Sequence, residues 1–140
     1  MVKANEVHGT EGGKVRDLVD STLFVEWIRG KPEAVRFFSQ FRRGRRDLFA
    51  SVITCAEILV GMREEEKWKT LRLLRRVKWI PVTEEIADQA AAYMAQYSKT
   101  HGLTLADALI AATARVVGAR LVTLDKDFFP MTDVRVYVPY

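Results

Sequence analysis

The sequence predicts an α/β fold, a three-layer α/β/α sandwich with a central, mostly parallel sheet. Short segments rich in β-branched residues alternate along the chain with longer segments of helical periodicity. Strands that are separated by helices form parallel sheets with helices on their faces. The chain has 140 residues, of which 49% are hydrophobic and 29% charged, and this is sufficient for one domain with a substantial core.

Residues 1–14 are polar and contain three glycines, so we expect a flexible leader followed by one domain over 15–140. No apolar stretch is long enough to span a membrane. The single cysteine excludes an internal disulfide framework and fits the reducing cytoplasm.

The domain is expected to open with a strand over 15–20. Ser21 and Thr22 can cap the following helix, which Gly30 stops. Pro32 suits a first helical turn and begins a second helix, which continues to residue 41.

The middle of the chain repeats this alternation. A second strand is expected over 48–53, after which Thr54 opens a helix, and another helix covers about 67–76. Residues 78–82 are interrupted by Pro81, so they predict a weak strand at an edge of the sheet.

The last part of the domain contains two helices and two strands. A long helix begins at Thr83 and ends at His101 and Gly102, and Gly118 is placed to end a second helix over 104–117. The remaining strands are expected at 120–124 and 134–138.

Aromatic residues at helical positions are expected in the core, because such side chains are usually buried. They are Trp27, Phe37, Phe38, Phe41 and Trp68, and burial is expected also of Trp79 in the weak strand. Cationic residues cluster at 42–46 and 72–76, which fits either solvated helix ends or contact with an anionic partner.

Five carboxylates are expected at one edge of the sheet. Asp20 ends the first strand, and Asp125 and Asp127 follow the strand at 120–124. Glu57 and Asp107 are placed in the first turns of helices, where free N–H groups favour an anion. Asp107 lies in an almost wholly apolar run, so its charge needs partners or a metal. Sites in parallel sheets collect at the carboxyl ends of the strands.

Each of these carboxylates also has a purely structural interpretation. Asp20 could be an N-cap, and Asp125 and Asp127 could form a polar turn. Glu57 and Asp107 each stand three residues after a threonine, the spacing of a capping box. Their joint placement favours a cluster, and clustered carboxylates repel one another unless a cation intervenes.

The available ligands indicate Mg²⁺ or Mn²⁺. Cys55 has no partner cysteine, His8 lies in the predicted leader and His101 near a helix end, which argues against a zinc site. Carboxylate sites favour Mg²⁺ or Mn²⁺, which bind together with substrate phosphate and promote phosphodiester hydrolysis. The net charge of +4, despite the acidic cluster, fits a basic surface that holds a phosphate chain.

Four segments resemble the PIN-domain nucleases, specifically the VapC-type toxins of prokaryotic toxin–antitoxin pairs. In family order they are 18–22 (LVDST), 51–61 (SVITCAEILVG), 105–114 (LADALIAATA) and 121–128 (LVTLDKDF). The resemblance implies a toxin that is a Mg²⁺- or Mn²⁺-dependent endoribonuclease, with RNA as its substrate. It also implies a homodimer and inhibition by a small antitoxin protein.

Carried over by position, the catalytic carboxylates would be Asp20, Glu57, Asp107, Asp125 and Asp127. Asp20 and Asp107 would be the principal metal ligands, and Glu57 would complete the ligand set or orient a water. The last acidic position of the family varies, and Asp125 ranks before Asp127 because it lies closer to the strand end.

Ser21 and Thr123 would support the site by hydrogen bonds. Thr22 is a departure, because family members often carry Asn at this position. The alternative is a non-catalytic module that binds nucleic acid or regulates, PIN-like or receiver-like, since a fold does not fix activity. A receiver domain normally has an adjacent acidic pair after its first strand, which Asp20-Ser21-Thr22 lacks.

Overall fold

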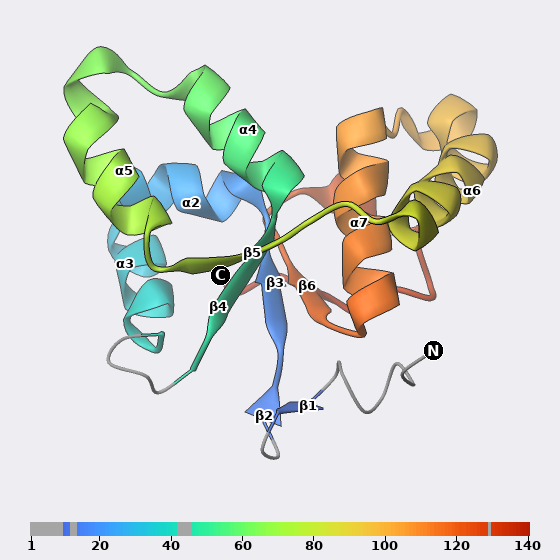
Figure 1. Cartoon of the computed structure of the whole chain (residues 1–140), viewed down its shortest axis with the longest axis horizontal. Coiled ribbons are helices and arrows are strands. Elements are labelled where there is room, and N and C mark those ends of the chain that lie inside the picture. The colour runs from blue at the N-terminus through green and yellow to red at the C-terminus, as the bar shows by residue number, and fades with distance from the viewer. Residues whose placement is uncertain (1–9, 12–13, 42–45, 129) are drawn as a thin grey trace.

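The computed structural model describes residues 10–11, 14–41, 46–128 and 130–140. Its centre is a five-stranded sheet in which every pairing is parallel, with the strand order β5-β4-β3-β6-β7 (Figure 1). The strands are β3 (Asp17–Val19), β4 (Leu48–Ser51), β5 (Val77–Ile80), β6 (Arg120–Val122) and β7 (Val136–Tyr137).

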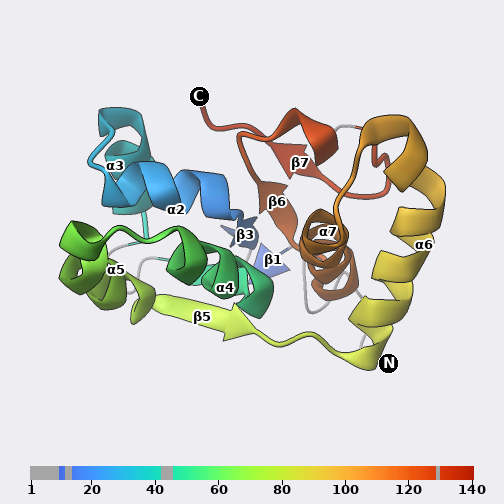
Figure 2. The ribbon, with the colours of Figure 1, turned by 90° about the horizontal axis from the view of Figure 1, so that it is seen from above.

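Six α-helices of the described residues flank this sheet. They are α2 (Ser21–Ile28), α3 (Pro32–Ser39), α4 (Val52–Gly61), α5 (Lys67–Leu74), α6 (Glu84–His101) and α7 (Leu105–Val117). Two 3₁₀ turns, η1 (Glu64–Glu66) and η2 (Lys126–Phe128), lie in the connections. Seen from above, α2 to α5 lie on one side of the sheet and α6 and α7 on the other (Figure 2). The predicted three-layer α/β/α sandwich is confirmed.

Each face of the sheet has its own core, because successive strand side chains point to opposite faces. Val19 and Val122 belong to the cluster formed with α2 to α5, which contains the fully buried Phe24. Leu18 and Leu121 belong to the cluster formed with α6 and α7. The two clusters pack against opposite faces of the short β3, and this packing fixes the position of Asp20, which directly follows the strand.

The aromatic residues of α2 and α3 are buried as predicted. Trp27 and Phe38 stack with their ring centroids 4.0 Å apart, and Phe37 and Phe41 pack beside them. Trp68 is an exception to the predicted core, because 79% of its surface is exposed.

Helix α4 begins earlier than the sequence predicts. Ser51 caps it by accepting a hydrogen bond from the Ile53 backbone N–H at 3.0 Å, so β4 ends at Ser51. Thr54 therefore lies inside the helix, and the capping box from Thr54 to Glu57 is wrong. Glu57 lies in the second turn of α4 and not in the first.

Other boundaries follow local chemistry. Strand β5 is an edge strand as predicted and ends before Pro81, which has no N–H to donate. Gly102 and Gly118 end α6 and α7 with φ of 66° and 67°, the left-handed conformation that glycine favours. The first strand of the sheet begins at Asp17, two residues later than predicted.

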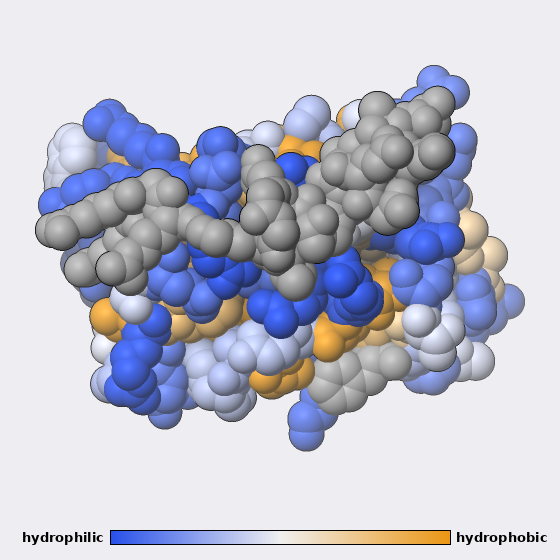
Figure 3. All heavy atoms as spheres, turned by 90° about the horizontal axis from the view of Figure 1, so that it is seen from below, coloured by the Kyte–Doolittle hydropathy of each residue, from blue (hydrophilic) through white to orange (hydrophobic). Residues whose placement is uncertain are grey.

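The residues before β3 form a separate antiparallel pair, β1 (Thr10–Glu11) with β2 (Lys14–Val15). The rest of the predicted leader, and most of the arginine cluster at 42–46, lie outside the described residues. The face at the amino ends of the strands is largely hydrophilic, with apolar side chains scattered over it (Figure 3). Among the described residues, no helix combines the length and the apolarity needed to cross a membrane.

Candidate active site

The carboxyl ends of β3 and β6 bring the predicted acidic residues to one edge of the sheet. Asp20 directly follows β3, and Asp125 follows β6 by three residues. Carboxylate oxygens of Asp107, Asp125 and Asp127 all lie within 4.8 Å of one another. Asp20 and Glu57 lie close enough to this group for their charges to interact with it. All five predicted carboxylates therefore face one region.

Both carboxylate oxygens of Asp20 accept hydrogen bonds. Its Oδ1 accepts the backbone N–H of Ser21 at 2.7 Å, which makes Asp20 itself the N-cap of α2, in place of the predicted Ser21 or Thr22. Its Oδ2 accepts the hydroxyl of Thr123 at 2.7 Å. With 3% of its surface exposed, Asp20 is buried, so these hydrogen bonds fix its orientation.

Thr123 connects two parts of the site. Besides donating to Asp20, its Oγ1 accepts the backbone N–H of Asp125 at 2.9 Å. Asp125 Oδ1 in turn accepts the backbone N–H of Asp127 at 2.9 Å, so the turn after β6 is organised around these side chains. Thr22 adds a second connection, since its Oγ1 accepts the Leu124 N–H at 3.4 Å. Sequence reasoning considered Thr22 only as a helix cap and as a departure from the family, and did not expect this contact.

Asp107 and Glu57 reach the site from helices. Asp107 and Thr104 form a reciprocal capping box at the start of α7, with hydrogen bonds of 3.1 and 3.3 Å. The structural and the functional interpretations of Asp107 are thus compatible. Glu57 projects from α4, and its buried Oε1 has no hydrogen-bond partner among the described residues. An unpartnered buried carboxylate oxygen is costly unless another ligand satisfies it.

The cluster is electrostatically unfavourable as it stands. Burial raises the pKa of Asp20, and the charges of Asp107 and Asp125 raise it further against the hydrogen bonds from Thr123 and Ser21. Burial likewise raises the pKa values of Glu57 and Asp107, and neighbouring carboxylates add to both effects.

No ion pair within the described part of the chain involves any of these five carboxylates. Among the described residues, the site therefore concentrates negative charge without an ion-pair partner to balance it.

Asp17 provides the contrast, at the other end of the same strand. Its side chain is fully buried, yet Arg120 binds both carboxylate oxygens at 2.8 and 3.0 Å, and Arg46 binds Oδ2 at 2.8 Å. Asp17 and Asp20 are both buried and only three residues apart, yet only Asp17 forms ion pairs with arginines among the described residues. Sequence reasoning did not single out Asp17, because its partners lie 29 and 103 residues away.

The raised pKa of Asp20 predicts an unusual pH dependence of stability. A carboxylate that holds its proton more tightly in the folded protein disfavours folding once it ionises. The cost is absent below the unfolded pKa of about 4 and is complete above the raised folded pKa. Without divalent cations, Asp20→Asn should therefore gain stability relative to the wild type as pH rises above about 4.

Urea unfolding in EDTA across this pH range measures the difference. The exposed Asp88 supplies the control, since Asp88→Asn should show no gain of this kind. A difference between Asp20→Asn and the wild type that stays constant with pH would contradict the prediction.

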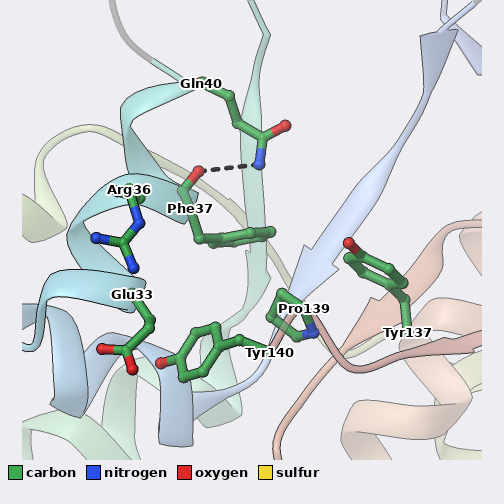
Figure 4. A pocket seen from close by; sticks show the side chains of 7 residues that line it. All are labelled: Glu33, Arg36, Phe37, Gln40, Tyr137, Pro139 and Tyr140. Atoms are coloured by element: carbon green, nitrogen blue, oxygen red, sulfur yellow. Dashed lines mark hydrogen bonds between the residues drawn. The ribbon is translucent and has the colours of Figure 1, made fainter.

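One of two surface pockets described here adjoins the acidic cluster, and the other does not. A groove of about 520 Å³ along α2 begins at Ser21 and Thr22 and ends at Arg29 and Lys31, so it adjoins the acidic cluster. A second pocket of about 400 Å³ lies between α3 and the C-terminal segment, and contains none of the predicted site residues (Figure 4). Its lining is Glu33, Arg36, Phe37, Gln40, Tyr137, Pro139 and Tyr140.

Comparison with known proteins agrees with this geometry. The family profile described as PIN domain matches residues 18–133, which include all five carboxylates. Ribonuclease VapC19 of Mycobacterium tuberculosis is 36% identical over 115 residues, covering 81% of this chain and 92% of that protein. Ribonuclease VapC10 of the same organism is 38% identical over 115 residues, covering 81% and 86%.

Solved structures show the same fold. A toxin–antitoxin complex from Klebsiella pneumoniae matches with a TM-score of 0.72 and 26% identity, covering 89% of this chain and 98% of that one. FitAcB from Neisseria gonorrhoeae matches with a TM-score of 0.66 and 27% identity, covering 88% and 97%. By profile, sequence and fold, this chain belongs to the PIN-domain family and, within it, to the VapC group.

Proposed function

We propose that this chain is the toxin of a toxin–antitoxin pair and a divalent-metal-dependent endoribonuclease. The observation that carries the proposal is the convergence of five carboxylates at one edge of the sheet, with no ion-pair partner among the described residues. Two relatives from Mycobacterium tuberculosis are named ribonucleases, and they match over most of their length. The alternative of a non-catalytic module is disfavoured because these relatives are named ribonucleases.

The residues present fit a Mg²⁺ or Mn²⁺ ion. Their donors are carboxylate oxygens, which these ions prefer. The unpartnered Glu57 Oε1 and the mutual repulsion among Asp20, Asp107 and Asp125 would both be relieved by a cation. We assign Asp20 and Asp107 as principal ligands, Asp125 as the next acidic ligand, and Glu57 as a further ligand or the group that orients water.

Asp125 is preferred to Asp127 because of its position in the cluster. The charge of Asp125 is among the largest influences that raise the pKa of Asp20, of Glu57 and of Asp107, whereas that of Asp127 is among the largest only for Asp107. Asp127 is also exposed, whereas Asp125 is partly buried.

In phosphodiester hydrolysis, a bound divalent ion lowers the pKa of water and stabilises charge on the leaving oxygen. The chain's own residues supply the positioning. Thr123 and the Ser21 backbone fix both oxygens of Asp20, and Thr104 fixes Asp107 through the helix cap. These hydrogen bonds favour the ionised carboxylates, so they hold the site in the form that accepts a cation.

The partners follow from the same relatives. The solved chain from Klebsiella pneumoniae was found in a toxin–antitoxin complex, and we infer that a small antitoxin protein also inhibits this chain. We further infer that the toxin acts on RNA in the cytoplasm as a homodimer. The free Cys55 fits a reducing compartment.

A cleavage assay with the purified chain tests the activity. Total RNA should be cut in the presence of Mg²⁺ or Mn²⁺, and EDTA should abolish the cutting, because the carboxylates cannot polarise water without the ion. Adding excess Mn²⁺ back should restore cleavage. Equal cleavage in EDTA would refute the metal dependence, and no cleavage under any condition would refute the nuclease.

A further inference from the structure

Helix α5 carries a basic and aromatic face that lies outside the acidic site. Residues 67–76 contain five cationic side chains and no acidic one, and the three glutamates of η1 directly precede them. Thr70, Leu73 and Leu74 are buried against the rest of the protein. Trp68 is 79% exposed, although burial is the rule for a side chain of this size.

Trp68, Arg72 and Arg75 lie on one outward stripe of this helix, hereafter the Trp68 stripe. Their spacing of four and three residues places them on the same helical face, opposite the buried residues. All three are exposed. With a rise of 1.5 Å per residue, the stripe is about 10 Å long, which is enough to follow a short stretch of an extended chain.

The cations of this helix are available to an external anion. Within the described part of the chain, Lys67, Lys69, Arg72 and Arg75 make no ion pair. Lys67 lies 5.8 Å from the centre of the Trp68 ring, so positive charge adjoins the aromatic surface.

The start of α5, which contains Trp68, lies at the same end of the molecule as the acidic site (Figure 1). In Figure 1, α5 begins at the upper end of the molecule, to which the carboxyl ends of β3 and β4 also point. In the view from above, α4 and α5 lie on the same side of the sheet as consecutive helices, and α4 carries Glu57 (Figure 2). A polynucleotide that occupies the acidic site can therefore extend along α4 toward α5.

We propose that the Trp68 stripe binds single-stranded RNA beside the cleavage site. Trp68 would stack on a base, while Arg72 and Arg75 hold phosphates. This inference rests on the proposed nuclease function and adds to it a site for the uncleaved part of the substrate. Proteins that bind single strands combine a cationic surface with aromatic side chains in this manner.

The charge of the stripe favours RNA over a protein occupant. Lysine is depleted at the centres of protein interfaces, whereas here Lys67 lies beside the aromatic ring. A second copy of this chain would also bring identical positive charges together. Stacking of a base tolerates many sequences, so the stripe would contribute affinity more than recognition of one sequence.

Binding is measured by fluorescence anisotropy with a labelled 12-nucleotide single-stranded RNA. All proteins carry Asp107→Asn, so that the RNA remains intact. Trp68→Ala should weaken binding about tenfold, because the stacking of one base is lost. Trp68→Phe, which keeps an aromatic ring, should retain most of the affinity.

The two arginines are tested together. Arg72→Gln with Arg75→Gln should lower the slope of log Kd against log salt by about 1.4, since each phosphate contact on a single strand contributes about 0.7. Lys99→Gln with Arg36→Gln removes the same charge from other exposed positions, and is the matched control. An equal change of slope in the control would overturn the proposal.

Kinetics with the intact acidic site separate this inference from the nuclease itself. Trp68→Ala should raise KM about tenfold and leave kcat unchanged, because the stripe contacts RNA away from the reacting bond. If the wild type cleaves RNA and Trp68→Ala changes neither KM nor binding, the proposal that the stripe binds RNA is wrong. The proposed nuclease activity is then unaffected. If the wild type cleaves nothing, the nuclease is wrong, and the anisotropy alone decides whether the stripe binds RNA.

Oligomeric state and antitoxin binding identify other occupants. Sedimentation of the wild type and of Trp68→Ala should give the same mass, and both should bind the antitoxin equally. A change of mass, or a loss of antitoxin binding with RNA affinity unchanged, would overturn the proposal in favour of a protein interface.

Discussion

Asp107→Asn should reduce kcat for RNA cleavage at least about a hundredfold, the loss typical when one preorganised charged or polar group is removed from an active site. Asp107 lies at the centre of the acidic group, with its oxygens within 4.8 Å of those of Asp125 and Asp127. Asparagine has the same shape and keeps one carbonyl oxygen, which can still accept the Thr104 N–H at the start of α7. The substitution thus removes charge and retains the helix cap.

Circular dichroism and thermal unfolding of the variant establish that it remains folded. Asp88→Asn, which makes the same chemical change at an exposed position of α6, should cleave like the wild type. Isothermal titration with Mn²⁺ adds a readout that is independent of turnover, and Asp107→Asn should bind the ion more weakly. Full cleavage by a well-folded Asp107→Asn protein would exclude Asp107 from the catalytic site.

Asp17→Asn should lower the free energy of unfolding by about 3–5 kcal/mol, because removing one partner leaves buried charge uncompensated. Arg120 binds both oxygens of Asp17, and Arg46 binds one of them. The side chains of these arginines are only 28% and 21% exposed, so water replaces the lost carboxylate poorly. The effect should appear in urea unfolding at pH 7.

A surface ion pair supplies the comparison for Asp17. Asp47 pairs with Lys78 at 2.9 Å, but the two side chains are 33% and 62% exposed. Asp47→Asn should therefore cost at most about 1 kcal/mol. Because Asp17 lies at the far end of β3 from the acidic cluster, Asp17→Asn should keep the wild-type kcat at temperatures where it is folded. Similar costs for the two variants would show that the buried network contributes little.

The fold could be predicted because it depends on patterns that are local. Alternation of short apolar segments with amphipathic ones predicted the layers, and Pro81 predicted the edge strand. The start of α4 could not be predicted in this way. Ser51 and Thr54 are both good N-caps three residues apart, and pairing of β4 with β5 through Ser51 decides between them. Glu57 therefore lies one helical turn later in α4 than predicted, but it still reaches the site.

The acidic cluster was predictable as a set of positions, because ends of strands and starts of helices can be read from the sequence. The way in which each charge is satisfied was not predictable. Asp17 and Asp20 differ by three residues in sequence, yet arginines neutralise only the first. Trp68 was misplaced for a related reason, since its helical spacing does not reveal which side of α5 faces the core.

Asp20 and Asp107 are proposed as metal ligands and also cap helices, so two backbone segments are sensitive to what their carboxylates bind. The amide protons of Ser21 and Thr104 are donated to these side chains. Any ligand that draws electron density from the carboxylates must weaken those two hydrogen bonds and shift the amide resonances. The opening turns of α2 and α7 are therefore built-in spectroscopic reporters of occupancy, readable by NMR titration without a label on the nucleic acid.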